Sequence, residues 1–534
     1  MLKSILKKTH SFKITSNNLS VIVLLLSTCA RIMISLTYPL GSGPDWVLYP
    51  GSAIELFSDT ISNPYIMIDR NGYYPFLIWP FIQFENGLNY LVILQHFICI
   101  LLTIWTVRLM YIFLGKPIAI LCALVLSLYQ PLLIIAHITN SETACLIPLW
   151  GLFLCTLSII YRNAKGEKIP FILWFGFSLF GSLATVARPS GLLLLFSCIV
   201  TLWILKTNRR VMLKIVLCFI CFSLIIPLYN YYRLGYFGLE KKAGRTLFAL
   251  VYMTDHTYSP SNGPYSQKVA DLLRDAWPEL LVKNTVVQKN NENIEDLLSA
   301  PEELPYDLYY LIVNLARKKY PYDAADKILL SAAMEAIQKH KSKYIVSRLK
   351  SLLISIIKNP YHQLKFRLSN TAKPPIRTIS QAKDRRYAGT SILYTMRGYH
   401  QTEEQVSTFQ KKYMAIRPSE KKQRWNTGIK LCKVWHETIQ PAYIVIYFFI
   451  FLFLYIIYKY PHRIYSDEYR KEIMMISIAS ILYCIGNRVF VYAVSKGDEL
   501  HLLPHLPFEL IFFISGIYGA CALHFMSKNK SASV

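Results

Sequence analysis

Residues 19–53 read LSVIVLLLSTCARIMISLTYPLGSGPDWVLYPGSA. The run from Leu19 to Leu40 is long enough to cross a bilayer, which takes about 20 apolar residues. Asp45, the first acidic residue of the chain, follows directly. We therefore expect Asp45 where the chain leaves the lipid. A carboxylate at that boundary suits two roles, a general base or an ordinary loop or helix-capping acid.

The composition of the whole chain is typical of a polytopic membrane protein. Of 534 residues, 53% are hydrophobic and 17% are charged, whereas soluble proteins carry about 25% charged residues. The net charge of +26 suggests a nucleic-acid partner. However, most basic residues flank apolar segments or lie in one large loop, and we find no nucleic-acid-binding motif. We expect membrane lipids as partners and no nucleic acid.

The apolar runs predict an all-α polytopic fold with about ten or more membrane-spanning helices. We expect the spans at Leu19–Leu40, Leu88–Leu114, Pro117–Ile138, Thr143–Tyr161, Pro170–Val186, Gly191–Leu205, Val211–Tyr231, Ala442–Tyr458, Ile473–Val494 and Phe508–Phe525. This pattern divides the chain into an N-terminal membrane module (1–232), a large, mainly helical insert (233–440) and C-terminal membrane helices (441–534).

Lysine and arginine are distributed unevenly between the two sides of these spans. With the N-terminus in the cytoplasm, the short loops on the opposite side hold only Arg70, Arg188 and Lys496. This asymmetry follows the positive-inside rule and predicts cytoplasmic termini with the insert outside. Four separated polar positions then share the external face: Asp45, Glu142, Arg188 and His501.

One segment of the insert has an amphipathic pattern. Residues 344–358 read YIVSRLKSLLISIIK, with short apolar runs between Arg and Lys. The pattern favours a helix on the membrane surface, and an ordinary helix packed within the external domain has the same signature. Both interpretations are open from the sequence.

The first candidate site residues lie around the first span. Asp45, Tyr49 and Ala53 are four residues apart and share one face if the stretch is helical. Arg31 lies inside the span, where a charge costs a few kcal/mol unless it is paired or close to water. We expect Arg31 to face the protein interior, as the partner of an acid or as a ligand contact.

Four later motifs add further candidates. Tyr74 belongs to an aromatic and proline-rich run (71–80) that suits a broken interfacial helix or simple membrane anchoring. Glu142 opens a predicted helix, where an acid is favourable to the helix dipole. Arg188 lies in a tight external hairpin, as a lipid-phosphate anchor or as the ion-pair partner of a carboxylate. His501 and His505 have metal-ligand spacing, but Pro504 between them disfavours a continuous helix, so we predict no metal site.

Taken in order, these motifs resemble those of the GT-C membrane glycosyltransferases, and most closely the bacterial protein O-mannosyltransferase and aminoarabinose (lipid A) transferase-like group. The resemblance covers residues 1–240 and, less closely, the last hundred; the insert has no counterpart in it. It rests on Arg31, Asp45-x3-Tyr49-x3-Ala53, the Tyr-Pro run at 74–75, Leu128-Tyr-Gln-Pro131, Ser141-Glu142, Ala187-Arg-Pro-Ser-Gly191, Pro227-x2-Asn230 and Leu503-Pro504-x2-Pro507.

Two departures from the family pattern concern the acid and the last loop. Many members have adjacent acids after the first helix, whereas Asp45 is followed by Trp46. The Arg-Tyr often found before the final Pro-x-x-Pro is replaced by Leu-His501-Leu-Leu. Donor contacts from that loop are therefore not carried over.

The resemblance implies an inverting glycosyltransferase in a bacterial inner membrane. It would move a sugar from a polyprenyl-phosphate carrier to a glycan, lipid or protein acceptor on the periplasmic face. Asp45 would be the base, with Asp69 as the other candidate. Phosphate contacts are assigned to Arg188, Arg31, Lys241, Lys242 and Arg245, and further site candidates are Tyr49, Tyr74, Glu142 and His501.

The cofactor and the function class both have alternatives. Some members of the family use a divalent cation and others do not, so a cation is left open. A transporter or flippase, with Arg31 and Asp45 on a substrate path, is one rival interpretation. An O-antigen ligase or polymerase-type protein is the other.

Overall fold

The computed structural model describes most of the N-terminal two thirds of the chain. The described residues are 15–37, 49, 52–53, 56–57, 73–137, 141–188, 191–239, 243–283, 294–299 and 306–357, with single residues at 452, 455 and 511. Several predictions fall outside them: Asp45, Asp69, Lys241, Lys242, His501 and the three C-terminal spans.

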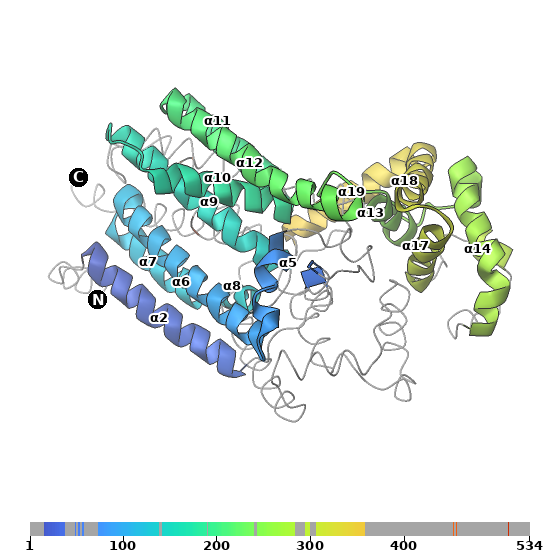
Figure 1. The fold of residues 1–534 in the computed structure, drawn as a ribbon, viewed down its shortest axis with the longest axis horizontal. Helices are drawn as coiled ribbons and strands as arrows, with labels where there is room; N and C mark the ends of the chain where they lie inside the picture. The colour runs from blue at the N-terminus through green and yellow to red at the C-terminus, as the bar shows by residue number, and fades with distance from the viewer. Residues whose placement is uncertain are drawn as a thin grey trace, which may run out of the picture.

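Every described element is helical, which confirms the all-α class for this part of the chain (Figure 1). Among the described residues, four helices are long and apolar enough to cross a membrane: α2 (Ser16–Thr37), α6 (Gly87–Leu114), α9 (Ser141–Ala164) and α12 (Arg209–Leu234). Shorter apolar helices join them in one bundle: α7 (Lys116–Leu128), α10 (Phe171–Ala187) and α11 (Gly191–Ile204). The remaining short elements here are α5 (Tyr73–Ile78) and η1 (Phe81–Gln83).

One predicted span is wrong as a single helix. Within Pro117–Ile138, α7 ends at Leu128 and a separate helix, α8, covers Gln130–Ala136. Tyr129 between them is extended (φ −68°, ψ 108°). Pro131 explains the break, because inside a continuous helix its ring would clash with the preceding turn and its missing N–H would leave a carbonyl unpaired.

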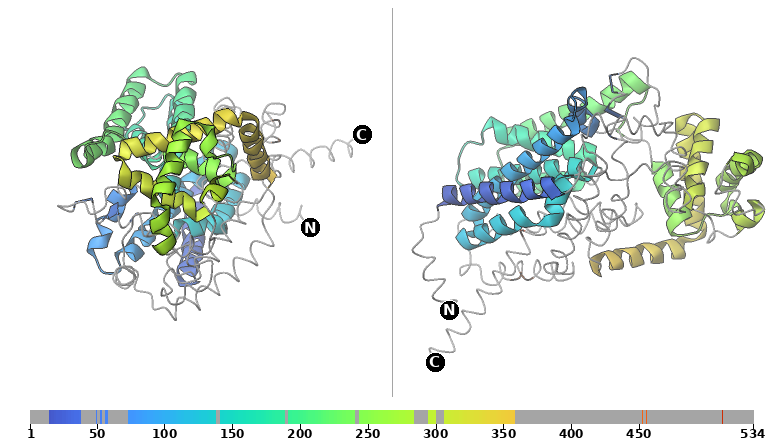
Figure 2. Two further views of the ribbon diagram at one scale, coloured as in Figure 1. Left: turned by 90° about the vertical axis from the view of Figure 1, so that its right-hand side faces the viewer. Right: turned by 90° about the horizontal axis from the view of Figure 1, so that it is seen from below.

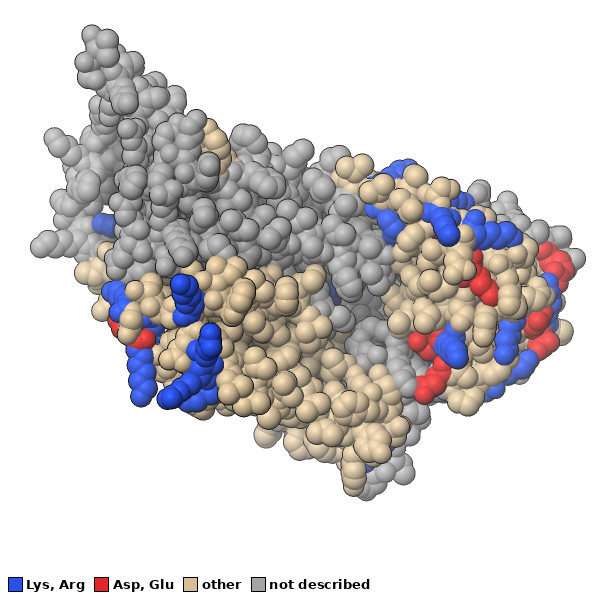
Figure 3. Space-filling view, turned by 90° about the horizontal axis from the view of Figure 1, so that it is seen from above, with Lys and Arg blue, Asp and Glu red and all other residues tan. Residues whose placement is uncertain are grey.

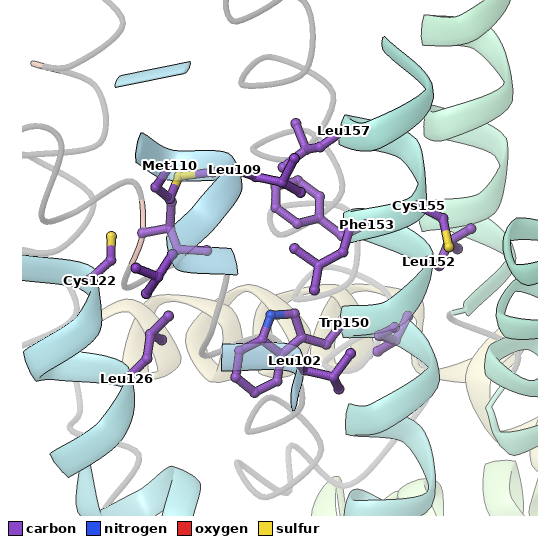
Figure 4. Packing of buried hydrophobic residues seen from close by; sticks show 14 of the residues in the cluster. Leu102, Leu109, Met110, Cys122, Leu126, Trp150, Leu152, Phe153, Cys155 and Leu157 are labelled. Carbon is purple, nitrogen blue, oxygen red and sulfur yellow. The ribbon is translucent and has the colours of Figure 1, made fainter. Parts of the chain in front are cut away.

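Helix α9 lies at the centre of the bundle, and its side chains pack against α6 and α10. Trp150 is fully buried, and its Nε1–H donates to Thr106 Oγ1 of α6 at 2.8 Å. Figure 4 shows Trp150 and Phe153 packed beside Leu102 and Leu109 of α6. A polar contact of the same kind joins Ser27 of α2 to Ser127 of α7 (2.8 Å). Such hydrogen bonds between helices replace the hydrophobic drive that is missing in lipid.

A tight turn joins α10 to α11 and determines where Arg188 lies. The amide of Gly191 donates to the Arg188 carbonyl at 2.9 Å, and the Arg188 amide donates to the Ala184 carbonyl at 3.0 Å. A Cβ atom on Gly191 would lie 2.4 Å from the Ala184 carbonyl oxygen and 2.8 Å from the Thr185 nitrogen. Only glycine therefore fits this close approach of two backbones.

The described part of the insert forms a helical body at one end of the bundle (Figures 1 and 2). It is reached from α12 through Gly235, which is left-handed (φ 65°). We call it the extramembrane domain, after the location that the sequence predicts for it. Four aromatic side chains pack together in its core: Phe248, Tyr252, Tyr258 and Tyr309. Its elements are α13 (Ala243–Ala249), η2 (Leu250–Thr254), η3 (Pro260–Asn262), α14 (Pro264–Lys283), α16 (Ile294–Ser299), α17 (Tyr306–Lys319), α18 (Tyr322–Lys339) and α19 (Lys341–Ile357).

The charge distribution agrees with a membrane-embedded bundle. On the face seen in Figure 3, Lys and Arg gather at one end of the bundle and over the extramembrane domain, and the described surface between them carries almost none. Large apolar side chains are exposed along the bundle, including Phe196, Trp203 and Leu217. An apolar surface of this extent suits contact with lipid tails.

We expect Gly191→Ala to destabilise the α10–α11 turn by roughly 1–3 kcal/mol, the usual cost of overpacking. The methyl group would meet backbone atoms, which cannot rotate away. Thermal unfolding of the purified protein in detergent measures the loss. The matched control is Gly176→Ala in α10, whose new Cβ would meet only Cys155 Sγ at 3.2 Å. Equal melting temperatures for the two variants would contradict this account of the turn.

Candidate functional site

Polar side chains from six elements meet where the bundle adjoins the extramembrane domain. The helix α5 lies at this end (Figure 1). The start of α9 and the end of α10 lie there too, as the contact between Glu142 and Arg188 shows. Helix starts and ends carry unpaired backbone groups and dipole charge, so polar side chains are favourable at these positions.

Glu142 and Arg188 form a largely buried ion pair. Arg188 Nη2 lies 2.7 Å from Glu142 Oε1, and the two side chains are 14% and 6% exposed. Of the two roles left open for Arg188, the structure shows the ion-pair partner of a carboxylate. Glu142 opens α9 as predicted, and it also holds the side chain at the end of α10. Each charge has the sign that its helix end favours.

Two aromatic side chains complete this part of the cluster. The rings of Tyr49 and Tyr74 pack edge to face with centroids 5.4 Å apart. Tyr74 donates its hydroxyl to Gln95 Oε1 at 2.7 Å. Burial, and then the neighbouring Tyr49 and Glu142, raises the pKa of Tyr74 well above its ordinary value. Tyr74 therefore keeps its proton at neutral pH and remains a hydrogen-bond donor.

A second chain of contacts runs from Arg31 into the same region. Arg31 Nη1 lies 2.9 Å from His96 Nδ1, and His96 Nε2 lies 3.1 Å from His137 Nδ1. All three residues are buried. A guanidinium only donates, so His96 Nδ1 must accept. His96 then carries its proton on Nε2 and donates to His137, which makes both rings neutral members of a directed chain.

Arg31 is therefore buried as expected, and its hydrogen-bond partner among the described residues is a histidine. Its Nε and Nη2 atoms are buried and have no hydrogen-bond partner in the described part of the chain. A buried cation with open donors is costly unless an anion or water lies close to it. Arg31 therefore carries two open donors inside the bundle.

Gln95 joins the two groups of side chains. It accepts from Tyr74, and its Nε2 donates to the Ala136 carbonyl at 3.1 Å, beside His137. Its neighbour His96 reaches His137 itself. Two consecutive residues of α6 therefore connect the aromatic cluster to the end of α8 and to Arg31.

The structure brings together five of the predicted site residues: Arg31, Tyr49, Tyr74, Glu142 and Arg188. Arg245 lies elsewhere, in α13 of the extramembrane domain, where its backbone is bound by Asp326 and Tyr309. Sequence reasoning missed Gln95 and His96. Their signal was a polar pair in the middle of an apolar span, a position that usually faces the protein interior.

Within the described ranges, no group of three His, Cys, Asp or Glu side chains is placed to hold a metal ion. The arrangement can instead bind an anion or orient a hydroxyl group through arginine and tyrosine donors. No protein-family model matches the chain, and no significant match is found among curated proteins or solved structures.

We expect Arg188→Met and Glu142→Leu each to cost roughly 3–5 kcal/mol, because either one leaves an uncompensated buried charge. The double variant should lose much less than the sum. Unfolding free energies of the three variants in detergent measure this coupling.

The control for this cycle is Arg162→Met, which removes an exposed pair with Glu167 (40% and 44% exposed). That change should cost at most about 1 kcal/mol. Additive losses in the Glu142 and Arg188 variants would show that the pair has no energetic coupling.

Proposed function

We propose that this protein is an inverting glycosyltransferase of GT-C architecture with ten or more membrane spans. Its donor would be a polyprenyl-phosphate sugar, and its acceptor a glycan, lipid or protein on the periplasmic face of a bacterial inner membrane. The observation that supports it most is the convergence of Tyr49, Tyr74, Glu142 and Arg188. These residues come from four separate motifs of the family pattern and meet at one end of the bundle.

In this proposal Asp45 is the base. It precedes Tyr49 by four residues, which reach at most about 14 Å, so we assign it to the same cluster. Its carboxylate takes the proton of the acceptor hydroxyl while that oxygen forms a bond to the anomeric carbon of the sugar. The bond between the anomeric carbon and the phosphate oxygen breaks, and polyprenyl phosphate leaves with the electron pair.

Arg188 is the group we assign to the leaving phosphate. A planar guanidinium has five N–H donors and matches phosphate geometry. A contact to Glu142 through Nη2 is therefore compatible with a second contact to phosphate. Glu142 would act as a positioning residue that holds Arg188, and the preorganised charge would stabilise the transition state.

A transporter or flippase is the second candidate, and one observation favours it. The chain Arg31–His96–His137 is buried between apolar helices, and ionisable residues in such places often mark substrate or proton paths. Proteoliposomes separate the two functions. A flippase moves the polyprenyl-phosphate sugar across the bilayer without an acceptor, whereas a transferase cleaves it only when an acceptor is present.

The proposed topology places both termini in the cytoplasm and the extramembrane domain outside. We expect a membrane-impermeant maleimide to label Lys327→Cys, exposed on α18, in intact spheroplasts of an otherwise cysteine-free variant. A cysteine at Lys3 should react only after permeabilisation. The reverse pattern would reject the topology and with it the external site.

We expect Asp45→Asn to lower sugar transfer by about 10² to 10⁴, the usual loss when a general base is removed. Asparagine keeps the size and hydrogen bonding of the side chain, so expression and donor binding should persist. The assay uses purified protein with a panel of polyprenyl-phosphate sugars.

The neighbouring acids provide the controls for this experiment: Glu55→Gln, Asp59→Asn and Asp69→Asn. Each should retain transfer near the parent rate. Activity in Asp45→Asn together with its loss in Asp69→Asn would move the base to Asp69. Activity in all four variants would overturn the glycosyltransferase proposal.

A further inference from the structure

The helix α19 turns its polar face toward the protein and its apolar face outward. On the inner face, Ser347 Oγ donates to Asp255 Oδ1 at 2.6 Å. Arg348 forms an ion pair with the same oxygen, and the Asp255 side chain is completely buried. These contacts attach α19 to the segment that follows η2, so the orientation of the helix is determined by buried charge.

The outer face carries four large exposed side chains. Ile345, Val346, Leu349 and Leu353 are 54–63% exposed. With 3.6 residues per turn they occupy an arc of about 100° on the helix. In a soluble domain such a stripe would face the core. Here the core side is occupied by the charged contacts to Asp255, and the apolar stripe is left outside.

Exposed lysines border this stripe on both sides. Lys341 lies beyond one edge, and Lys343 and Lys350 lie beyond the other. An apolar stripe flanked by lysines fits a lipid surface, because the side chains enter the acyl region while the ammonium groups meet lipid phosphates. A protein partner would not require cations on both edges.

The helix α19 extends from α18 on the side of the extramembrane domain that adjoins the bundle, and Figures 1 and 2 show it running back toward the helical bundle. At the end of the bundle where α12 leads into the extramembrane domain, Tyr231, Tyr232 and Phe237 are 57–86% exposed. Exposed aromatic side chains of this kind are typical of the membrane–water interface.

We propose that α19 docks on the bilayer surface, with Ile345, Leu349 and Leu353 in the lipid and Lys341 and Lys350 on anionic headgroups. Through the Asp255–Arg348 pair, the docked helix holds the extramembrane domain against the membrane. This inference does not depend on the proposed glycosyltransferase activity, because none of the residues it rests on belongs to the proposed active site.

The test measures the surroundings of Leu349 in the full-length protein. Leu349→Cys and Lys327→Cys are each labelled with bimane in a cysteine-free variant and reconstituted into phosphatidylcholine vesicles with added phosphatidylglycerol. A nitroxide on the lipid acyl chain near the headgroup should quench the label at position 349 several-fold more than the label at 327. Aqueous iodide should show the opposite preference.

Two outcomes would overturn the proposal. Iodide quenching at position 349 equal to that at 327 would place the stripe in water. Protection from both quenchers would mean that protein covers it, either another segment of this chain or a partner.

A second variant tests the charge requirement. Lys341→Gln with Lys350→Gln should reduce lipid quenching at position 349 in the mixed vesicles to the level seen in phosphatidylcholine alone. Lys343 is kept, because it donates to the His256 carbonyl at 3.3 Å. Unchanged quenching would refute the role of anionic headgroups, and unchanged values at position 327 confirm that the domain is still folded.

Discussion

Glu142 and Arg188 can be buried only together, and the arrangement of the bundle end follows from this constraint. Either charge alone would pay a desolvation penalty of several kcal/mol. The 2.7 Å contact between them therefore holds the start of α9 to the end of α10. Helix α9 carries Trp150 in the centre of the core. The tight turn at Gly191 leaves Arg188 little freedom to move away. Packing and electrostatics thus position the same pair.

The two arginines of the cluster differ in a way that affects their chemistry. Arg188 has a carboxylate beside it, so the pair is neutral overall and is satisfied without a ligand. Among the described residues, Arg31 has His96 as its partner, and a neutral ring cannot balance a positive charge. The positive field around Arg31 therefore attracts anions or electron-rich groups. Arg188 can bind a further anion only while it keeps its contact with Glu142. In the proposed function, the donor phosphate would meet Arg188, which is already paired with Glu142, and Arg31, which within the described residues is paired only with a neutral ring.

The sequence predicted the helices, which depend on the apolar content of a segment. It missed features that depend on which side chains meet in the folded chain. The seven described bundle helices follow from apolar runs of sufficient length, and Arg31 was expected inside because a charge in lipid is costly. The two roles of Arg188 could not be separated, since Glu142 is 46 residues away. The break at Tyr129 was missed because apolar content continues through it. His96 was missed because an apolar run with one polar pair is still long enough to be a span.

The amphipathic segment illustrates the same limit. Its pattern of apolar and basic residues is equally compatible with a buried helix and with a surface helix. The choice depends on Asp255, which is 93 residues from Arg348 and whose carboxylate draws Ser347 and Arg348 inward. Once these polar residues face the domain, helical geometry leaves Leu349 and Leu353 no direction but outward. A buried acid in one segment thus determines which face another segment presents, and this coupling is invisible to any local pattern.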